Sequence, residues 1–144
     1  MKRYLLLFLI STLVGGPVAA LAGPPKSFLR GEASQWQVFE LRSDVDFQHA
    51  WDMVFDILIK DFDVAAVFKE EGYIRTEWLY SYGGKYNFEY RLRVTVRFTP
   101  DKKSLHVRTD AQFKDGDNWL LGVDSRLLTT LKTDLMGTVG RTTR

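Results

Sequence analysis

Residues able to do acid–base or nucleophilic chemistry are scarce in this chain, which contains two histidines and no cysteine. His49 has acidic neighbours at helical spacing: Asp46 lies three residues before it, and Asp52 and Asp56 lie three and seven residues after it. Such a cluster could hold a cation or pass a proton, but the same spacing is typical of a solvated helix flank. We favour the flank, and we predict no catalytic residue, no metal site and no cofactor.

The short motifs of familiar enzymes are also missing. The sequence contains no Gly-x-Ser-x-Gly elbow, no P-loop and no His-Glu-x-x-His pattern. The segment 114–118 has the acidic and glycine content of a calcium loop but not the ligand series of an EF-hand, so a tight turn explains it more simply. His106 is expected to be an exposed cross-strand partner. The sequence therefore predicts a protein that is not an enzyme.

Arginines at alternate positions of one predicted strand, over 86–99, are the strongest indication of a binding surface. Their side chains should share one face of the sheet with an arginine of the following strand. Such a face could bind an acidic protein surface, a glycan or anionic headgroups, although opposite charges across strands are also ordinary sheet chemistry. A tryptophan after the acidic turn is either a partner anchor or a plug over the core. The predicted binding residues are Arg91, Arg93, Arg97, Arg108 and Trp119.

A second function of a different class is a periplasmic carrier, in which a small apolar ligand occupies a pocket between helix and sheet. Trp51 and Trp78 fall on apolar faces and are expected in the core, whether it is solid or hollow. The small size of the chain argues against a large void. The pocket of such a carrier would be lined by Trp51, Phe55, Trp78, Tyr90 and Leu131.

Hydrophobic periodicity predicts the elements that would position these residues. Apolar residues at spacings of three and four indicate helices over 47–60 and about 125–137. Alternation indicates strands, and in the strand over 86–99 both Tyr86 and Phe88 are expected to face the core. The predicted strands cover 35–42, 63–68, 73–80, 86–99 and 104–114.

This order of elements predicts an α+β fold with two layers. An antiparallel sheet that alternates apolar and polar residues buries one face, and two amphipathic helices suffice to cover it. We therefore expect a two-layer sandwich of a four- to five-stranded antiparallel sheet with both helices on one face. This is an architecture of the helix-grip or TATA-binding-protein-like (TBP-like) kind.

The first 22 residues have the pattern of a secretory signal peptide: a basic start, an apolar run from Tyr4 to Val14, and small residues before position 23. The run is too short to span a bilayer. Gly23 stands where a bacterial lipoprotein needs cysteine, so we expect a soluble periplasmic protein. Residues 23–34 are expected to form a flexible leader, 35–144 a single domain, and the end of the chain after Val139 a frayed basic tail.

Charge restricts the class of partner. The chain has 20 Lys and Arg against 18 Asp and Glu, and removal of the signal peptide takes Lys2 and Arg3 with it. A domain without net positive charge lacks the main driving force for binding phosphate backbones, so nucleic acid is excluded. We expect the partner to be another envelope protein or an anionic surface, and we expect no membrane-spanning segment. The sequence makes no prediction of the oligomeric state.

The stretch from Phe47 to Trp78 resembles one half of the lipoprotein component C of the bacterial outer-membrane β-barrel assembly machinery (BamC). The Ala50-Trp51 pair in an amphipathic helix and the Gly72-Tyr73-Ile74 entry into a strand carry the resemblance. Further antiparallel strands and a closing helix follow in both. That family's domains are helix-grip folds without catalytic activity, acting as accessory parts of an envelope complex. The resemblance implies the same fold and role here, without the lipid-accepting cysteine and with one domain in place of two.

Overall fold

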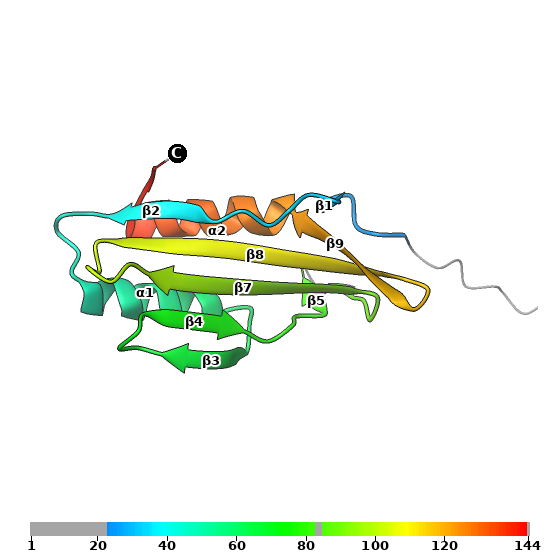
Figure 1. The fold of residues 1–144 in the computed structure, drawn as a ribbon, viewed down its shortest axis with the longest axis horizontal. Helices are drawn as coiled ribbons and strands as arrows, with labels where there is room; N and C mark the ends of the chain where they lie inside the picture. The colour runs from blue at the N-terminus through cyan, green and yellow to red at the C-terminus, as the bar shows by residue number, and fades with distance from the viewer. Residues whose placement is uncertain (1–22, 83–84, 144) are drawn as a thin grey trace, which may run out of the picture.

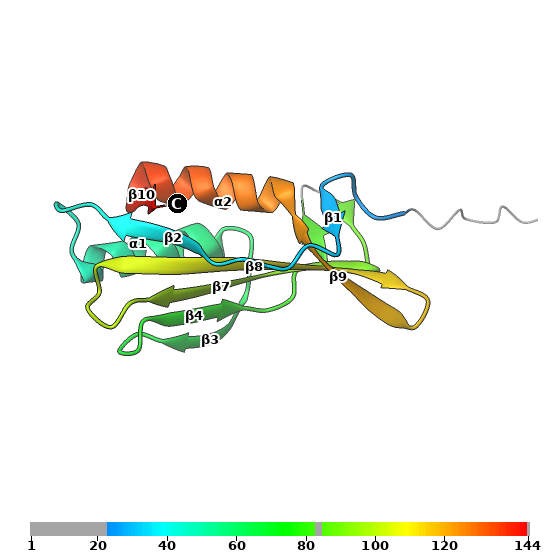
Figure 2. The ribbon, with the colours of Figure 1, turned by 45° about the horizontal axis from the view of Figure 1, so that its top comes forward.

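The computed structural model describes residues 23–82 and 85–143 of the chain. The expected signal peptide, residues 1–22, lies outside the described residues. The described part forms one large antiparallel sheet, with two helices packed on the same face of it (Figures 1 and 2). The elements in chain order are β1 (Phe28–Arg30), β2 (Gln37–Leu41), α1 (Phe47–Ile59), β3 (Val64–Phe68), β4 (Tyr73–Thr76), β5 (Ser81–Tyr82), β6 (Lys85–Tyr86), β7 (Tyr90–Phe98), β8 (Ser104–Asp115), β9 (Asn118–Asp124), α2 (Ser125–Thr138) and β10 (Gly140–Thr143).

The main sheet is built around the long strand β8. On one side β7 pairs with it, and the order continues outward through β4 to β3. On its other side β8 is shared by two partners: β2 pairs with residues 104–107 and β9 pairs with residues 111–115. Beyond these lie β10 next to β2, and β1 next to β9. The fold is therefore α+β, as predicted, with an antiparallel sheet and two helices.

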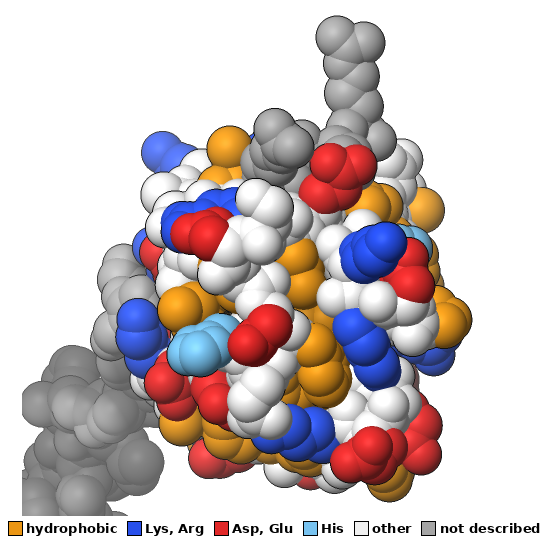
Figure 3. Space-filling model, turned by 90° about the vertical axis from the view of Figure 1, so that its left-hand side faces the viewer, with side chains coloured by type: hydrophobic (Ala, Val, Ile, Leu, Met, Phe, Trp, Pro, Cys, Tyr) orange, Lys and Arg blue, Asp and Glu red, His pale blue; other side chains and the backbone are white. Residues whose placement is uncertain are grey.

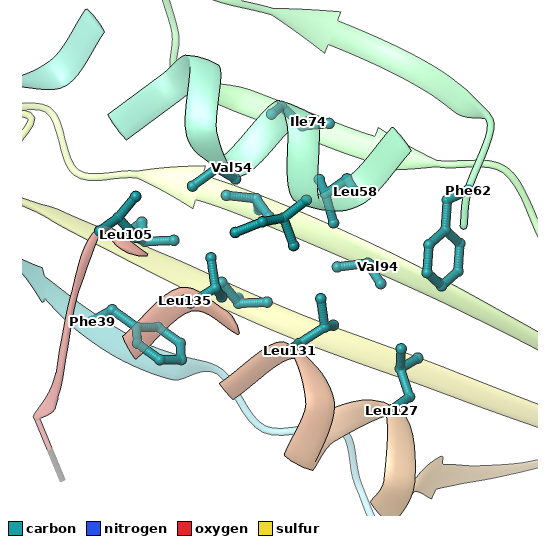
Figure 4. Packing of buried hydrophobic residues seen from close by; sticks show 14 of the residues in the cluster. Phe39, Val54, Leu58, Phe62, Ile74, Val94, Leu105, Leu127, Leu131 and Leu135 are labelled. Carbon is teal, nitrogen blue, oxygen red and sulfur yellow. The ribbon is translucent and has the colours of Figure 1, made fainter. Parts of the chain in front are cut away.

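The core lies between the helices and this sheet, and the predicted helical periodicity supplies it. Val54 and Leu58 of α1 and three leucines of α2 converge on the alternate residues of β7 and β8 that point toward the helices (Figure 4). Complete burial of each such aliphatic side chain contributes about 1.5–3 kcal/mol to stability. Both helices begin at an aspartate cap: Asp46 accepts a hydrogen bond from the backbone N–H of His49, and Asp124 accepts one from that of Leu127.

The sheet has eight strands, more than the four to five predicted. Three extra strands come from segments without clear periodicity. The leader expected to be flexible contains β1, whose Phe28 is 8% exposed, and the tail expected to be frayed contains β10. The acidic turn at 115–118 does not end the sheet, because it is a two-residue hairpin loop that leads into β9, with Gly116 at a φ of +60°. β1 and β10 form because a partner strand distant in sequence offers hydrogen bonds, and β9 forms because the hairpin places it beside β8. Local alternation does not reveal these pairings.

Two predicted strands are interrupted. Between β6 and β7 a turn is closed by the Asn87 side chain, which accepts from the Glu89 N–H, and Phe88 is 72% exposed instead of facing the core. The Tyr86 side chain lies outside the described residues. The strand predicted over 73–80 ends at Thr76, whose hydroxyl accepts from the backbone N–H of Val94. This break in alternation places Trp78 on the face of the sheet away from the core, so the prediction that Trp78 is a core residue is wrong.

A candidate binding face built from arginine and aromatic side chains

The face of the sheet opposite the helices carries a continuous row of side chains in which arginines alternate with aromatic rings. We call this row the arginine–aromatic ladder. Each member touches the next through a cation–π contact, an ion pair or a ring stack. In order, its members are Trp119, Arg91, Trp78, Arg93, Asp110, Arg108, Trp36, Arg97, Tyr73 and Phe68.

At the first end of the ladder, Arg91 of β7 lies between two tryptophans. Its guanidinium carbon is 3.8 Å from the ring centre of Trp119 and 4.5 Å from that of Trp78. The same guanidinium donates two hydrogen bonds, of 2.8 and 2.6 Å, to the side-chain oxygen of Gln112, the residue directly opposite it on β8. A third, of 3.3 Å, reaches the hydroxyl of Tyr80. Stacking and hydrogen bonding together fix this arginine in one orientation.

At the centre of the ladder, two arginines share one carboxylate. Arg93 donates a 3.0 Å hydrogen bond to Oδ2 of Asp110, which lies directly opposite it on β8, and also stacks on Trp78 at 4.3 Å. Arg108 Nε lies 3.4 Å from Oδ1 of Asp110, a charge contact without hydrogen-bond geometry. The Asp110 side chain is 17% exposed. This carboxylate therefore neutralises much of the positive charge at the middle of the face.

The other end of the ladder runs from Trp36, just before β2, to the edge strand β3. Trp36 lies under two guanidinium groups, 5.0 Å from Arg108 and 5.6 Å from Arg97. Arg97 is also 5.4 Å from the ring of Tyr73, which stacks on Phe68 with centroids 6.1 Å apart. Within the described residues Arg97 has ring contacts alone, with neither an ion pair nor a hydrogen-bond acceptor for its guanidinium. It is the exposed arginine of the ladder.

The structure brings the sequence-predicted binding residues together. Arg91, Arg93, Arg97, Arg108 and Trp119 all belong to the ladder. Trp119 is not in a loop, however, because it lies on β9 opposite Lys114.

Sequence reasoning missed the aromatic half of the ladder, namely Trp36, Trp78, Tyr73 and Phe68. Tyr73 could have been found, because in the predicted strand over 73–80 it alternates with the apolar Ile74 and therefore shares the face of Arg75. The break in alternation after Thr76, which places Trp78 on this face, leaves no signal in the sequence.

The five residues proposed to line a carrier pocket do not share one side of the sheet. Trp51, Tyr90 and Leu131 are buried in the core, and Phe55 packs at its margin. Trp78 lies on the opposite face under Arg91 and Arg93. These five side chains therefore cannot line a single cavity.

The histidines lie in exposed or half-exposed positions. His49 Nδ1 is 3.3 Å from Asp46 Oδ1, and the His49 backbone N–H and then its ring lower the pKa of that carboxyl below its usual range. Asp52 instead contacts Gln48 and Lys69. Figure 3 shows the end of the molecule where the two histidines lie apart, among charges of both signs. In the described part of the chain, no three His, Asp or Glu side chains gather as a metal site would require.

Comparisons with protein families, curated proteins and solved structures identify no relative of this chain. No protein-family model matches the chain, and no significant match exists among curated proteins or solved structures. Of the described helices, none combines the length and apolar character needed to cross a membrane.

Proposed function

We propose that this protein is a non-enzymatic, exported module of the bacterial cell envelope that binds another protein through the arginine–aromatic ladder. The ladder is the observation that carries the proposal. Tryptophan, tyrosine and arginine are the residues most enriched at the energetic centres of protein interfaces. Here eight of them are gathered on one open sheet face, beside Leu121, which is 65% exposed.

The side chains of the ladder are already held in place in the free protein, which favours protein binding at this face. A free arginine loses side-chain entropy when it binds, at a cost of about 0.5–1.5 kcal/mol for each immobilised long side chain. Arg91 is already held by two indole rings and Gln112. A partner that contacts Arg91 therefore binds a side chain whose conformational entropy was already lost during folding.

The charge of the face favours a protein over an anionic surface. Asp110 neutralises part of the charge of Arg93 and Arg108, and Gln112 occupies two donors of Arg91. A membrane or polyanion is attracted by dense uncompensated charge. The alternation of rings, guanidinium groups and one carboxylate instead matches a partner surface with mixed apolar and acidic groups.

The envelope location and the helix-grip architecture belong to this proposal. The location is supported by the signal-peptide pattern of residues 1–22. The architecture is supported by a long antiparallel sheet with both helices on one face and by the resemblance of residues 47–78 to BamC domains. Intact mass of the protein recovered from its native envelope tests the location, because cleavage after Ala22 gives a chain that begins at Gly23.

Site-specific photo-cross-linking in living cells tests the binding face. A photoreactive residue is placed at Leu121 on the ladder face, and as a matched control at Lys132, which is exposed on α2. We expect one discrete protein adduct from position 121, none from position 132, and loss of the adduct when Arg91→Ala is added. Equal adducts from both positions, or adducts that ignore Arg91→Ala, would overturn the proposal.

A further inference from the structure

The end of the ladder at β3 and β4 is hollowed into a pocket. Its volume is about 390 Å³, and its lining comes from Phe68, Glu71, Tyr73, Arg97 and Phe98. The floor is a cross-strand row, in which Phe68 on β3 pairs with Tyr73 on β4, and Tyr73 pairs with Arg97 on β7. Glu71 comes from the turn between β3 and β4. The pocket is within the size range of small-ligand sites.

Arg97 differs from the other arginines of the ladder. Arg91 is hydrogen-bonded to Gln112, and Arg93 and Arg108 share Asp110. In the part of the chain that the structure describes, the Arg97 guanidinium has aromatic neighbours and no acceptor. A guanidinium fork held between rings, with all its N–H donors available, is the arrangement that recognises a planar oxyanion with two parallel hydrogen bonds.

The other lining residues narrow the ligand class. The stacked aromatic side chains of Phe68 and Tyr73 provide apolar walls, so a carboxylate bound here should be attached near an apolar group. Glu71 adds one negative charge to the lining, which disfavours phosphates and other multiply charged anions.

We propose that this pocket binds an acidic side chain of the partner polypeptide, with a neighbouring aromatic or branched apolar side chain placed against Phe68 and Tyr73. The carboxylate bonds to Arg97, and the apolar side chain covers rings that water now wets. This inference rests on the proposed function, because it names the part of the ladder that distinguishes one partner sequence from another. Phe68, 54% exposed on the edge strand β3, makes the pocket accessible from outside the sheet.

Two capped dipeptides, Phe-Glu and Phe-Gln, serve as probes in an NMR titration of the mature protein. We expect Phe-Glu to shift the backbone amide signals of Phe68, Tyr73 and Arg97, with a Kd about tenfold lower than that of Phe-Gln, because one charge-assisted bidentate contact distinguishes them. Equal affinity for the two probes, or shifts confined to the Trp119 end of the ladder, would overturn the pocket assignment.

Variants separate the two parts of the pocket. Arg97→Gln should remove the tenfold preference for Phe-Glu, and Phe68→Ala should weaken both probes equally. Arg75→Gln is the matched control, because Arg75 is an exposed arginine of β4 that lies opposite Thr95 and outside the pocket lining. Dispersed amide spectra show that each variant is folded. A preference for Phe-Glu that is unchanged in Arg97→Gln contradicts the pocket assignment. If neither dipeptide binds but the cross-link from position 121 persists, the pocket assignment is wrong and the proposed function is retained.

Discussion

The hydroxyl of Tyr90 donates a 2.5 Å hydrogen bond to Oδ2 of Asp124, joining the start of β7 to the cap of α2. Asp124 is 1% exposed. The same carboxylate accepts from the Ser27 hydroxyl at 2.7 Å and from the backbone N–H of Leu127 at 2.8 Å. Burial first, and then the hydrogen bond and charge of Asp124, raise the pKa of Tyr90 far above its usual range, so the phenol stays a donor. Asp124 thus ties the N-terminal segment, the sheet and α2 together.

Tyr90→Phe should lower the free energy of unfolding by about 1–3 kcal/mol, because a buried carboxylate loses one of its donors. Urea unfolding followed by circular dichroism measures the change. Tyr80→Phe is the control, since the Tyr80 hydroxyl has a 3.3 Å contact with Arg91 on the open face and should change stability by less than about 0.5 kcal/mol. Equal effects of the two substitutions would show that the Tyr90–Asp124 bond has no special weight.

Asp124→Ala should destabilise the protein more than Tyr90→Phe does. It removes the α2 cap and leaves the buried hydroxyl of Tyr90 without its acceptor, for a total of about 2–4 kcal/mol. Asp124→Asn should recover part of this loss, because an amide oxygen still caps a helix. The same urea measurement decides, and an alanine variant as stable as the asparagine variant would contradict the capping role.

Stability should fall in acid partly because of Asp46. The backbone N–H of His49 lowers the pKa of the Asp46 carboxyl in the folded protein, so the folded value lies below the unfolded value of about 3.9. A depressed folded pKa gives stability that is present above the unfolded pKa and is lost as pH falls through the folded pKa. Between about pH 5 and pH 2, wild type should therefore lose more stability than Asp46→Asn. Urea unfolding of both proteins, measured at several pH values across this range, tests the prediction. A difference in unfolding free energy between the two proteins that stays constant with pH would contradict it.

Arg91 and Trp119 should be energetically coupled. A double-mutant cycle of Arg91→Ala and Trp119→Ala should give a coupling free energy of about 0.5–2 kcal/mol, because the guanidinium lies 3.8 Å from the indole centre. The control cycle pairs Arg75→Ala with Trp119→Ala. Additive effects in both cycles would show that the ladder contact contributes nothing to stability.

The helices and the two long central strands could be read from the sequence. In α1 and α2 apolar residues repeat at the helical period, and in β7 and β8 they alternate over many residues. The pattern of each element alone therefore predicts which of its sides is buried. The arginines of β7 fell on the open face for the same reason. Local periodicity is enough where one element alone decides which side faces the core.

The ladder and its pocket depended on the tertiary structure. Trp119 reaches Arg91 because β9 folds back along β8, and Trp36 reaches Arg97 and Arg108 because it directly precedes β2, which pairs with the other half of β8. Trp78 joins them after the break in alternation at Thr76.

The sequence by itself determined which apolar residues of β7 and β8 face the core and which arginines lie on the opposite face of the sheet. Only the tertiary structure decided which rings stack on those arginines and that Arg97 has no acceptor in the described chain. The reason is that side-chain periodicity is a property of one strand. Strand order and register come from pairings between distant segments, whose hydrogen bonds have the same backbone chemistry everywhere in the chain.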